Sequence, residues 1–444
     1  MQTIISRLRQ SASVKVFAIG FLILLLLIPL NMVRGTIEDR SQIHQTARLD
    51  IHRTWGQAQV VAGPVLVLPY DAVYVSDRGE RFTNRRELYL LPAELAIDAS
   101  VDSEIRYRGI HKVPVYSANI RLQGHFEAID TKRFDIDEAN IHWDDASIVV
   151  GVSDGRAIAE TPNLELNGES IAFVPGGQLV DGFPPQIQAF LGDALSENRA
   201  RGLSFDMMLR LKGSDALKFL PLGDTTRASM TSTWASPSFS GAYLPHSRDI
   251  GDGGFTADWK VSSIGRSLPS HWTDGSNSAA LAASAAFGVD LFVPISVYRL
   301  TMRAVTYGVL FVVLTFVSYF MFEVIVGLRL HPLQYLMVGS ANVIFFLLLI
   351  SLAEHIGFGS AYVASALASS GLVVGYSASV LGERGRAMII GGILFTLYCF
   401  LYMTLKAETY ALLAGSVGLW TALAMVMFLT RRIDWYRTSG TSSP

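Results

Sequence analysis

The sequence predicts a membrane protein with six transmembrane helices and a large extracytoplasmic, mainly β domain between the first and second helix. Half of the 444 residues are hydrophobic, but the apolar residues concentrate at residues 14–33 and after residue 304. The charges are divided in the same way. Residues 34–303 hold 26 Lys or Arg and 33 Asp or Glu, a net of −7 (26 − 33), whereas the rest holds 10 and 5, a net of +5 (10 − 5). An acidic middle between basic flanks fits a domain exported to one side of a membrane.

The first predicted span is the charge-free run of residues 16–33, which can cross about 30 Å of hydrocarbon if its ends stretch slightly. Basic residues precede it, as in a signal peptide, but no small-x-small cleavage site follows. We therefore interpret residues 1–33 as a cytoplasmic tail and a retained anchor, rather than as a cleaved signal. Five further apolar runs predict a helix bundle over residues 304–430, before a tail at 431–444. These runs are residues 304–327, 333–353, 360–382, 387–405 and 410–430.

The distribution of positive charge predicts the orientation, because Lys and Arg of short loops are retained in the cytoplasm. With the N-terminus inside, nine basic residues lie in cytoplasmic segments, and the two short external loops carry only Lys406. The nine are Arg7, Arg9, Lys15, Arg329, Arg384, Arg386, Arg431, Arg432 and Arg437. Both termini are therefore expected to be cytoplasmic and residues 34–303 periplasmic.

The exported segment has the pattern of a β-rich domain that follows a short helix over residues 34–56. Alternating apolar residues between turn residues predict many short strands, in a sandwich or in two packed β lobes. The expected strands are residues 60–75, 86–101, 113–128, 146–153, 203–213, 228–235, 255–264 and 287–294. One helix is expected over residues 185–198, and the Ser/Ala-rich segment 274–286 is interpreted as a mobile loop.

No arrangement of residues predicts catalysis, a cofactor or a metal site. Residues 151–155 match GxSxG, but the following residues lead to Pro162 and another strand, so Ser153-Asp154-Gly155 is interpreted as a turn. The nine histidines form no HExxH motif, and His142 with the two aspartates after it is the nearest approach to a metal site. Cys399 is the only cysteine, so no intramolecular disulfide is possible. A nucleic-acid partner is not expected, because no stripe of Lys and Arg is present.

Polar residues within or beside the spans are functional candidates, because ionisable groups in lipid are costly. The candidates are Glu323, Asn342, Glu354 and His355. Glu323 could reach the interface or pair with Arg329. The group could instead make only interhelical hydrogen bonds, or it could line a polar pathway. The glycines of the spans, which include a GxxxG at residues 371–375, predict close helix packing, with a gating hinge as the alternative.

The sequence resembles the CreD family of inner-membrane, cell-envelope integrity proteins over nearly the whole chain. The resemblance is carried by Trp55-Gly56, Gly63-Pro64 and six longer segments, whereas Ser296 and Thr306 depart from the family pattern. The segments are SPSFSGAYLP (236–245), GFTADWKV (254–261), LTFVSYFMFE (314–323), HPLQYLMVG (331–339), SLAEHIGF (351–358) and FLTRRIDWY (428–436), with the glycine and tryptophan pairs named above. The resemblance implies an association with envelope integrity and the β-lactam response, under a two-component regulator, and it implies no reaction.

Three classes of function follow from these observations. The first is a non-catalytic envelope protein whose outer domain binds a periplasmic protein, a lipid or the cell wall. The second is a transporter or lipid-handling protein that uses the bundle, and the third is an extracytoplasmic enzyme without recognisable motifs. In each case the lipid bilayer is a partner.

Residues 236–245 predict a shaped loop, because Ser, Pro and Gly make a poor regular strand. The loop would place Phe239 and Tyr243 beside Trp234, an aromatic group suited to binding a partner or a carbohydrate. The alternative interpretation is that these three aromatics close one end of the β core.

Overall fold

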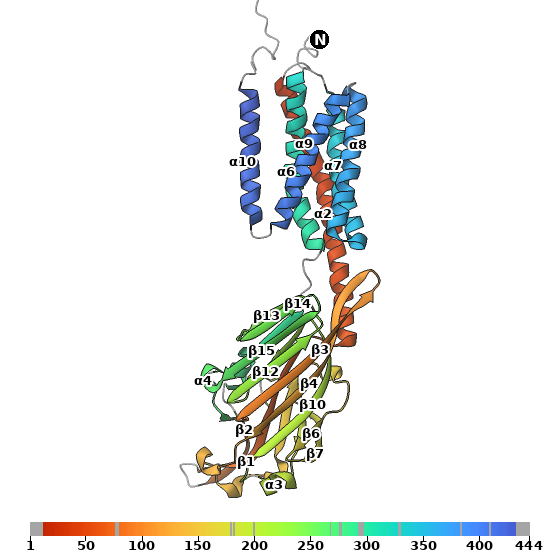
Figure 1. Cartoon of the computed structure of the whole chain (residues 1–444). Coiled ribbons are helices and arrows are strands. Elements are labelled where there is room, and N and C mark those ends of the chain that lie inside the picture. The colour runs from red at the N-terminus through yellow and green to blue at the C-terminus, as the bar shows by residue number, and fades with distance from the viewer. Residues whose placement is uncertain are drawn as a thin grey trace, which may run out of the picture. The chain divides into compact units, whose positions relative to one another are not determined.

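A computed structural model of the protein describes residues 12–75, 80–177, 180, 183–198, 200–266, 268–274, 278–291, 297–326, 330–381, 384–407 and 410–431. The chain forms two compact units, shown in Figure 1. The β domain is Thr46–Pro294, and the helical unit combines the residues up to Gln45 with those from Ile295 onward. Helix α2, Ala12–Trp55, contributes residues to both units. The expectation of a helix that continues from the anchor to the Trp55-Gly56 pair is confirmed.

The helical unit contains the predicted apolar segments as helices. They are α6 (Val297–Val326), α7 (Pro332–Ile356), α8 (Phe358–Leu381), α9 (Arg384–Lys406) and α10 (Ala411–Thr430). Helix α2 and the first four of these are long and apolar enough to cross a membrane. The apolar part of α10 covers only Leu413–Phe428, so the sixth crossing stays a prediction.

Aromatic side chains fill the centre of the helical unit. Helices α6 to α9 pack against one another, and α10 touches α9 and α6. Phe345 and Phe346 of α7 are fully buried, and Phe345 packs against Tyr398 of α9 with ring centroids 4.7 Å apart. Gly371 and Gly375 of α8, in contrast, are exposed, with open space where a side chain would begin. The expected role of this GxxxG in close packing is therefore wrong for contacts within the described part of one chain.

Two sheets that share one hydrophobic core form the β domain (Figure 1). One has the order β13-β17-β11-β1-β5-β9-β8, with β2 paired to β1 and to β16, and the other has the order β14-β15-β12-β3-β4-β10-β6-β7. The strands of the first sheet are β1 (Gln59–Val75), β2 (Arg81–Leu90), β5 (Ser147–Val152), β8 (Val174–Gly177), β9 (Gln186–Phe190), β11 (Ala216–Phe219), β13 (Pro237–Gly241), β16 (His271–Thr273) and β17 (Phe287–Leu291). The second sheet contains β3 (Glu94–Arg108), β4 (His111–Phe126), β6 (Asn163–Leu166), β7 (Glu169–Ala172), β10 (Leu203–Ser214), β12 (Thr225–Ser232), β14 (Ser247–Gly251) and β15 (Gly254–Ser262).

Burial along the strands explains their sequence patterns. Strands β10 and β15 alternate between buried and exposed residues, because one face of their sheet meets the core and the other meets solvent. Strand β5 is buried at every residue, as are residues 61–70 of β1. Three 3-10 turns follow β4: η1 (Thr131–Phe134), η2 (Glu138–Asn140) and η3 (Trp143–Asp145). The last two lie against β1, and the His142 N–H donates to the Pro69 carbonyl at 2.9 Å.

Three sequence interpretations are wrong in detail. The helix expected over residues 185–198 is strand β9 followed by the short helix α3 (Asp193–Asn198), because β9 pairs with the edge of β5 and Gly192, at φ 50°, ends the strand. The segment interpreted as a mobile loop contains helix α5 (Ser278–Ser284), in which Ala282 is buried. Alanine is the strongest helix former, and no Gly or Pro interrupts that stretch. The loop expected over residues 236–245 contains strand β13, which pairs with β17. Ser276 lies outside the described residues.

Two glycines of the family-like pairs lie where backbones approach closely. Gly56 has φ 147°, and a Cβ there would lie 2.7 Å from the Lys212 carbonyl oxygen. Gly63 has φ 123°, and its Cβ would lie 2.8 Å from the Val149 carbonyl oxygen, at the irregularity where the β1–β5 register shifts. Both positions therefore require a residue without a side chain.

Replacing Gly56 with alanine is expected to destabilise the β domain by about 1–3 kcal/mol, because it adds backbone strain and a clash. Resistance of the purified protein to proteolysis at increasing temperature measures this change. Gly155→Ala is the matched control, since Gly155 has open space around it. Equal protease resistance of the two variants would contradict the prediction.

Candidate functional sites

Glu323 is the centre of a polar cluster inside the helical unit. Glu323 is only 4% exposed, and its Oε2 accepts a hydrogen bond from the Tyr335 hydroxyl at 2.9 Å. Its Oε1 accepts from the Leu330 N–H at 3.1 Å and forms an ion pair with Lys15 of α2. The carboxylate thus joins α2, α6 and the start of α7. The alternative partner, Arg329, lies outside the described residues.

Glu354 forms a second interhelical link, near the end of α7. Its side chain is buried, and it accepts a hydrogen bond from the Tyr298 hydroxyl of α6 at 3.0 Å. Arg40 of α2 lies 3.9 Å from its other carboxylate oxygen. His355 is exposed, and its Nδ1 lies 3.0 Å from the Ser351 carbonyl of its own helix. Glu354 therefore links α7 to α6 and α2, whereas the His355 ring contacts the backbone of its own helix.

Asn342 is fully buried on α7, and neither atom of its side-chain amide has a hydrogen-bond partner among the described residues. Ser365 of α8 is also buried without a partner for its hydroxyl in that part of the chain. A chain of hydrogen-bonded polar groups ends at Ala341, the residue before Asn342. The Tyr398 hydroxyl donates to Ser369 Oγ at 3.1 Å, and Ser369 donates to the Ala341 carbonyl at 2.9 Å. Unpaired buried amides are rare, so Asn342 stays a functional candidate.

The aromatic residues Trp234, Phe239 and Tyr243 are each partly buried and pack against the β core. Phe239 meets Phe255 edge to face, with centroids 5.6 Å apart, and Tyr243 meets Phe287 in the same way at 6.2 Å. The Trp234 indole N–H donates to the carbonyl of Ser236, two residues away. Phe239 and Tyr243 thus join one group of core rings, while each of the three keeps an exposed part.

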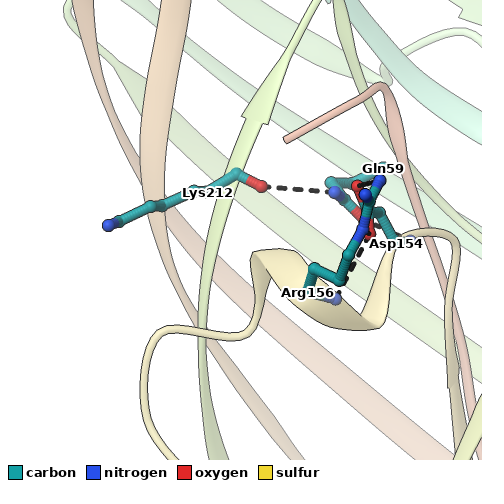
Figure 2. Close-up of polar contacts among 4 residues, drawn as sticks. All are labelled: Gln59, Asp154, Arg156 and Lys212. Carbon is teal, nitrogen blue, oxygen red and sulfur yellow. Dashed lines mark hydrogen bonds and ion pairs between the residues drawn. The ribbon is translucent and has the colours of Figure 1, made fainter. Parts of the chain in front are cut away.

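The GxSxG segment is a structural turn, as the sequence indicated. Ser153 Oγ accepts a hydrogen bond from the Val60 N–H at 3.0 Å. Asp154 begins the 3-10 turn η4 (Gly155–Ala157), and the Arg156 guanidinium beside it lowers the pKa of the Asp154 carboxyl. Figure 2 shows this pair beside Gln59, whose amide donates to the Lys212 carbonyl and accepts from the Asp154 N–H. These contacts hold the start of β1 against β5 and β10.

No group of three or more His, Cys, Asp or Glu in the described part of the chain could hold a metal ion. His142 Nε2 lies 3.1 Å from a carboxylate oxygen of Asp71 on β1. The pair is half-exposed, and it consists of one histidine and one carboxylate.

Sequence reasoning missed the site where the end of α2 binds the β domain. Asp215 accepts from Arg48 and lies 3.3 Å from His52 Nδ1. One turn further along α2, the Trp55 ring lies between the Arg106 guanidinium and the Lys212 ammonium, at 4.2 and 4.8 Å from its centroid. Its indole N–H donates to the Tyr116 carbonyl at 3.2 Å. The available signal in the sequence was the Trp55-Gly56 pair at the end of the helix. The tryptophan donates to the backbone of β4, and the glycine allows the backbone of β10 to approach closely.

An N-terminal apolar helix, further apolar helices and a β sandwich inserted between them define a multi-pass membrane protein with a large β-rich domain. Comparison with known proteins assigns the family. The family model described as Inner membrane protein CreD matches residues 11–436. Inner membrane protein CreD of Escherichia coli (strain K12) is 32% identical over 421 residues, which cover 94% of this chain and 92% of that protein. The chain belongs to the CreD family of inner membrane proteins, and the resemblance seen in the sequence is confirmed.

Proposed function

We propose that this protein is a non-catalytic component that supports cell-envelope integrity and the response to envelope stress and β-lactams. Its β domain lies in the periplasm and binds an envelope partner, which is a protein, a lipid or the cell wall. The observation that supports this function best is the size of the β domain together with the packing of the last turns of α2, which belong to that domain, on it through Trp55 and Asp215. The domain is joined by the chain to an apolar helix, so a partner that it binds is held near the membrane.

The orientation is part of the proposal. Both termini lie in the cytoplasm, with residues 1–33 as tail and anchor, 34–303 periplasmic, 304–430 as a bundle of five spans and 431–444 as a tail. The distribution of short-loop positive charge supports this orientation. Glu323 with Lys15 then lies near the cytoplasmic face, and Glu354 lies near the periplasmic face.

A transporter or lipid-handling function is the second candidate, and the unpaired buried amide of Asn342 favours it. The cavity beside Lys15 and Tyr335 has a volume of only about 10 Å³, room for about one water. The apolar cavity between α6, α9 and α10 measures about 20 Å³. Transport through either of these two cavities of the described helices would therefore require a second conformation, which makes this function the weaker proposal.

Crosslinking in intact cells tests the proposed function. A photoreactive residue at Leu244, which is 68% exposed beside Tyr243, is expected to capture an envelope component that a matched probe at exposed Glu169 on β7 does not capture.

In a Cys399→Ser background, Ser276→Cys is expected to react with an impermeant thiol reagent on whole cells, and Ser443→Cys is not. The reverse labelling pattern would show an inverted topology, and identical capture at both probes would remove the support for an aromatic binding surface.

Loss of single candidate catalytic groups is expected to leave the function intact. Alanine at Ser153, His142 or His355 should leave tolerance to envelope stress near wild type at equal protein levels, because their contacts are structural or local. Growth at graded β-lactam concentrations, with immunoblots for protein amount, measures this. A null phenotype in a folded, normally abundant variant would indicate catalysis or transport.

A further inference from the structure

An apolar groove lies between α6, α9 and α10 in the helical unit. Its wall includes Leu310 and Leu314 of α6 and Leu397 of α9, and Gly415 of α10 also lines it. A water can be centred in only about 20 Å³ of the groove, but the whole empty space, which is open on one side, is about 350 Å³. From Tyr307 to Leu314 the groove follows α6 for about 10 Å, at about 1.5 Å per residue. That length is about two-thirds of the ~15 Å of hydrocarbon in one leaflet of a bilayer.

Helix α10 leaves this groove uncovered. Gly418 packs directly on the Phe400 ring of α9, where a Cβ would clash with the ring. About one turn nearer the start of α10, a Cβ on Gly415 would meet nothing within 4 Å. The described helices therefore do not fill the space beside Gly415, and its occupant comes from outside them.

Arg303 lies at the end of the groove that is nearest the start of α6. It precedes Tyr307 by four residues and Leu310 by seven, so α6 places these three side chains on one face. Long side chains of a helix lean toward its N-terminus, so the Arg303 guanidinium and the Tyr307 hydroxyl extend toward the same end. Arg303 is half-buried, and neither polar group has a hydrogen bond or an ion pair within the described chain.

The charges at this end of the three helices are all positive among the described residues. Residues 297–307, 402–407 and 410–415 contain Arg299, Arg303 and Lys406 but no Asp or Glu, a net of +3 (3 − 0). A half-buried guanidinium without a partner is costly, and phosphate oxygens match its N–H donors in charge and in geometry. Glu408, in the α9–α10 connection, lies outside the described residues.

We propose that the groove binds an anionic phospholipid, with one acyl chain against α6, α9 and α10 and with its phosphate bound by Arg303 and the Tyr307 hydroxyl. The wall favours an acyl chain over another helix, because it consists mainly of large side chains, whereas helices in membranes pack through small ones. The net positive charge favours an anionic headgroup over a zwitterionic one, whose own cation would meet the same excess of positive charge. The inference depends neither on the orientation proposed above nor on a partner of the β domain.

Native mass spectrometry of the full-length protein in detergent tests the inference. The protein is mixed with equal amounts of phosphatidylglycerol and phosphatidylcholine that carry the same acyl chains. We expect one phosphatidylglycerol to stay bound, with a preference of at least about fivefold over phosphatidylcholine, the size of the attraction that one basic residue adds near anionic lipid. Glycerophosphoglycerol, which is the same headgroup without chains, and inorganic phosphate should not displace the lipid even in large excess, because the acyl chain supplies most of the free energy of binding. Equal retention of the two lipids, or displacement by either soluble phosphate, would overturn the inference.

Two charge variants locate the headgroup. Arg303→Gln should remove most of the preference for phosphatidylglycerol. Lys406→Gln is the matched control, because it removes the same charge at the same end of the helices on the α8 side of α9. Its ammonium lies 5.2 Å from the centroid of the Tyr402 ring, which packs on Tyr362 of α8. If Lys406→Gln lowers the preference as much as Arg303→Gln does, only the general positive charge attracts the lipid, and the proposed site is wrong.

Two glycine variants locate the acyl chain. Gly415→Phe should fill the groove and prevent retention of either lipid. Gly371→Phe, at a glycine of α8 that also has open space around it, should retain phosphatidylglycerol like the wild type. The thermal unfolding temperature of each variant shows whether its fold is intact. Retention of phosphatidylglycerol by a folded Gly415→Phe variant would contradict the inference, and Arg303→Gln tests it separately if Gly415→Phe does not fold.

Discussion

Replacing Glu323 with leucine is expected to destabilise the helical unit by about 3–5 kcal/mol, the usual cost of breaking a buried ion pair. The substitution removes the acceptor of Lys15, of the Tyr335 hydroxyl and of the Leu330 N–H at once. Because Tyr335 is 3% exposed, water cannot easily replace the lost partner of its hydroxyl. Thermal unfolding of the detergent-solubilised protein, followed by the onset of aggregation, measures the change.

Two further variants separate the charge from the hydrogen bonds. Glu323→Gln keeps an acceptor for Tyr335 but removes the negative charge, so it should cost less than leucine. Lys15→Met leaves the buried carboxylate unpaired, and the double variant Lys15→Met, Glu323→Gln should be more stable than the sum of the single costs predicts.

The control is Ser379→Leu, at an exposed position of α8 where the hydroxyl bonds only to its own helix. This variant is expected to keep wild-type stability. If Glu323→Leu is as stable as Ser379→Leu, the cluster contributes no net stabilisation, and its buried charge would have to serve conformational change or transport instead.

The sequence predicted elements whose cause is local and missed contacts whose cause is distant. The apolar runs predicted both ends of α7, α8 and α9 to within three residues, since a span is determined by its own composition. The start of α6 was predicted wrongly, because this helix begins at Val297, seven residues before the apolar run at 304. Alternation predicted β10 and β15, because each has one buried face. The partner of Glu323 was not predictable in this way, because Lys15 lies 308 residues away in the sequence.

The errors have the same origin. Residues 186–190 can form a helix or a strand by propensity, and the free edge of β5 decides for the strand. Pro237–Gly241 contains poor strand formers, yet β17 supplies a partner and Phe239 packs on the core. The groove beside Arg303 combines residues from three separate helices, so no local pattern could indicate it. Trp55 and Gly56 entered the sequence analysis only through the family resemblance, and their contacts with β4 and β10 depend on strands that are distant in the sequence.

Replacing Phe239 with alanine is expected to destabilise the β domain by about 3 kcal/mol, at the lower end of the cost for a core phenylalanine because the ring is only partly buried. The ring meets Phe255 and Trp259 edge to face, with centroids 5.6 and 5.8 Å apart. Both of those residues are almost fully buried, so the truncation would open a space against the core. Protease resistance of the full-length protein at increasing temperature measures the loss.

Phe190→Ala is the matched control, because Phe190 lies on β9 of the same domain and is 50% exposed. It should cost less than about 1 kcal/mol, as most surface substitutions do.

Tyr243→Ala tests the binding interpretation more directly. The Tyr243 hydroxyl donates to the Gly265 carbonyl at 3.0 Å and its ring is partly exposed, so its removal should disturb folding less than that of Phe239.

The two interpretations of the aromatic group predict different combinations of results. If the group serves only the core, Phe239→Ala lowers the amount of folded protein, and any loss of envelope-stress tolerance follows that amount. If the group is also a binding surface, Tyr243→Ala keeps normal abundance and protease resistance but loses both the tolerance and the species crosslinked from Leu244. A Phe239→Ala, Tyr243→Ala double variant that is stable and fully active would contradict both interpretations, because neither packing of these rings on the core nor their contact with a partner would then be needed.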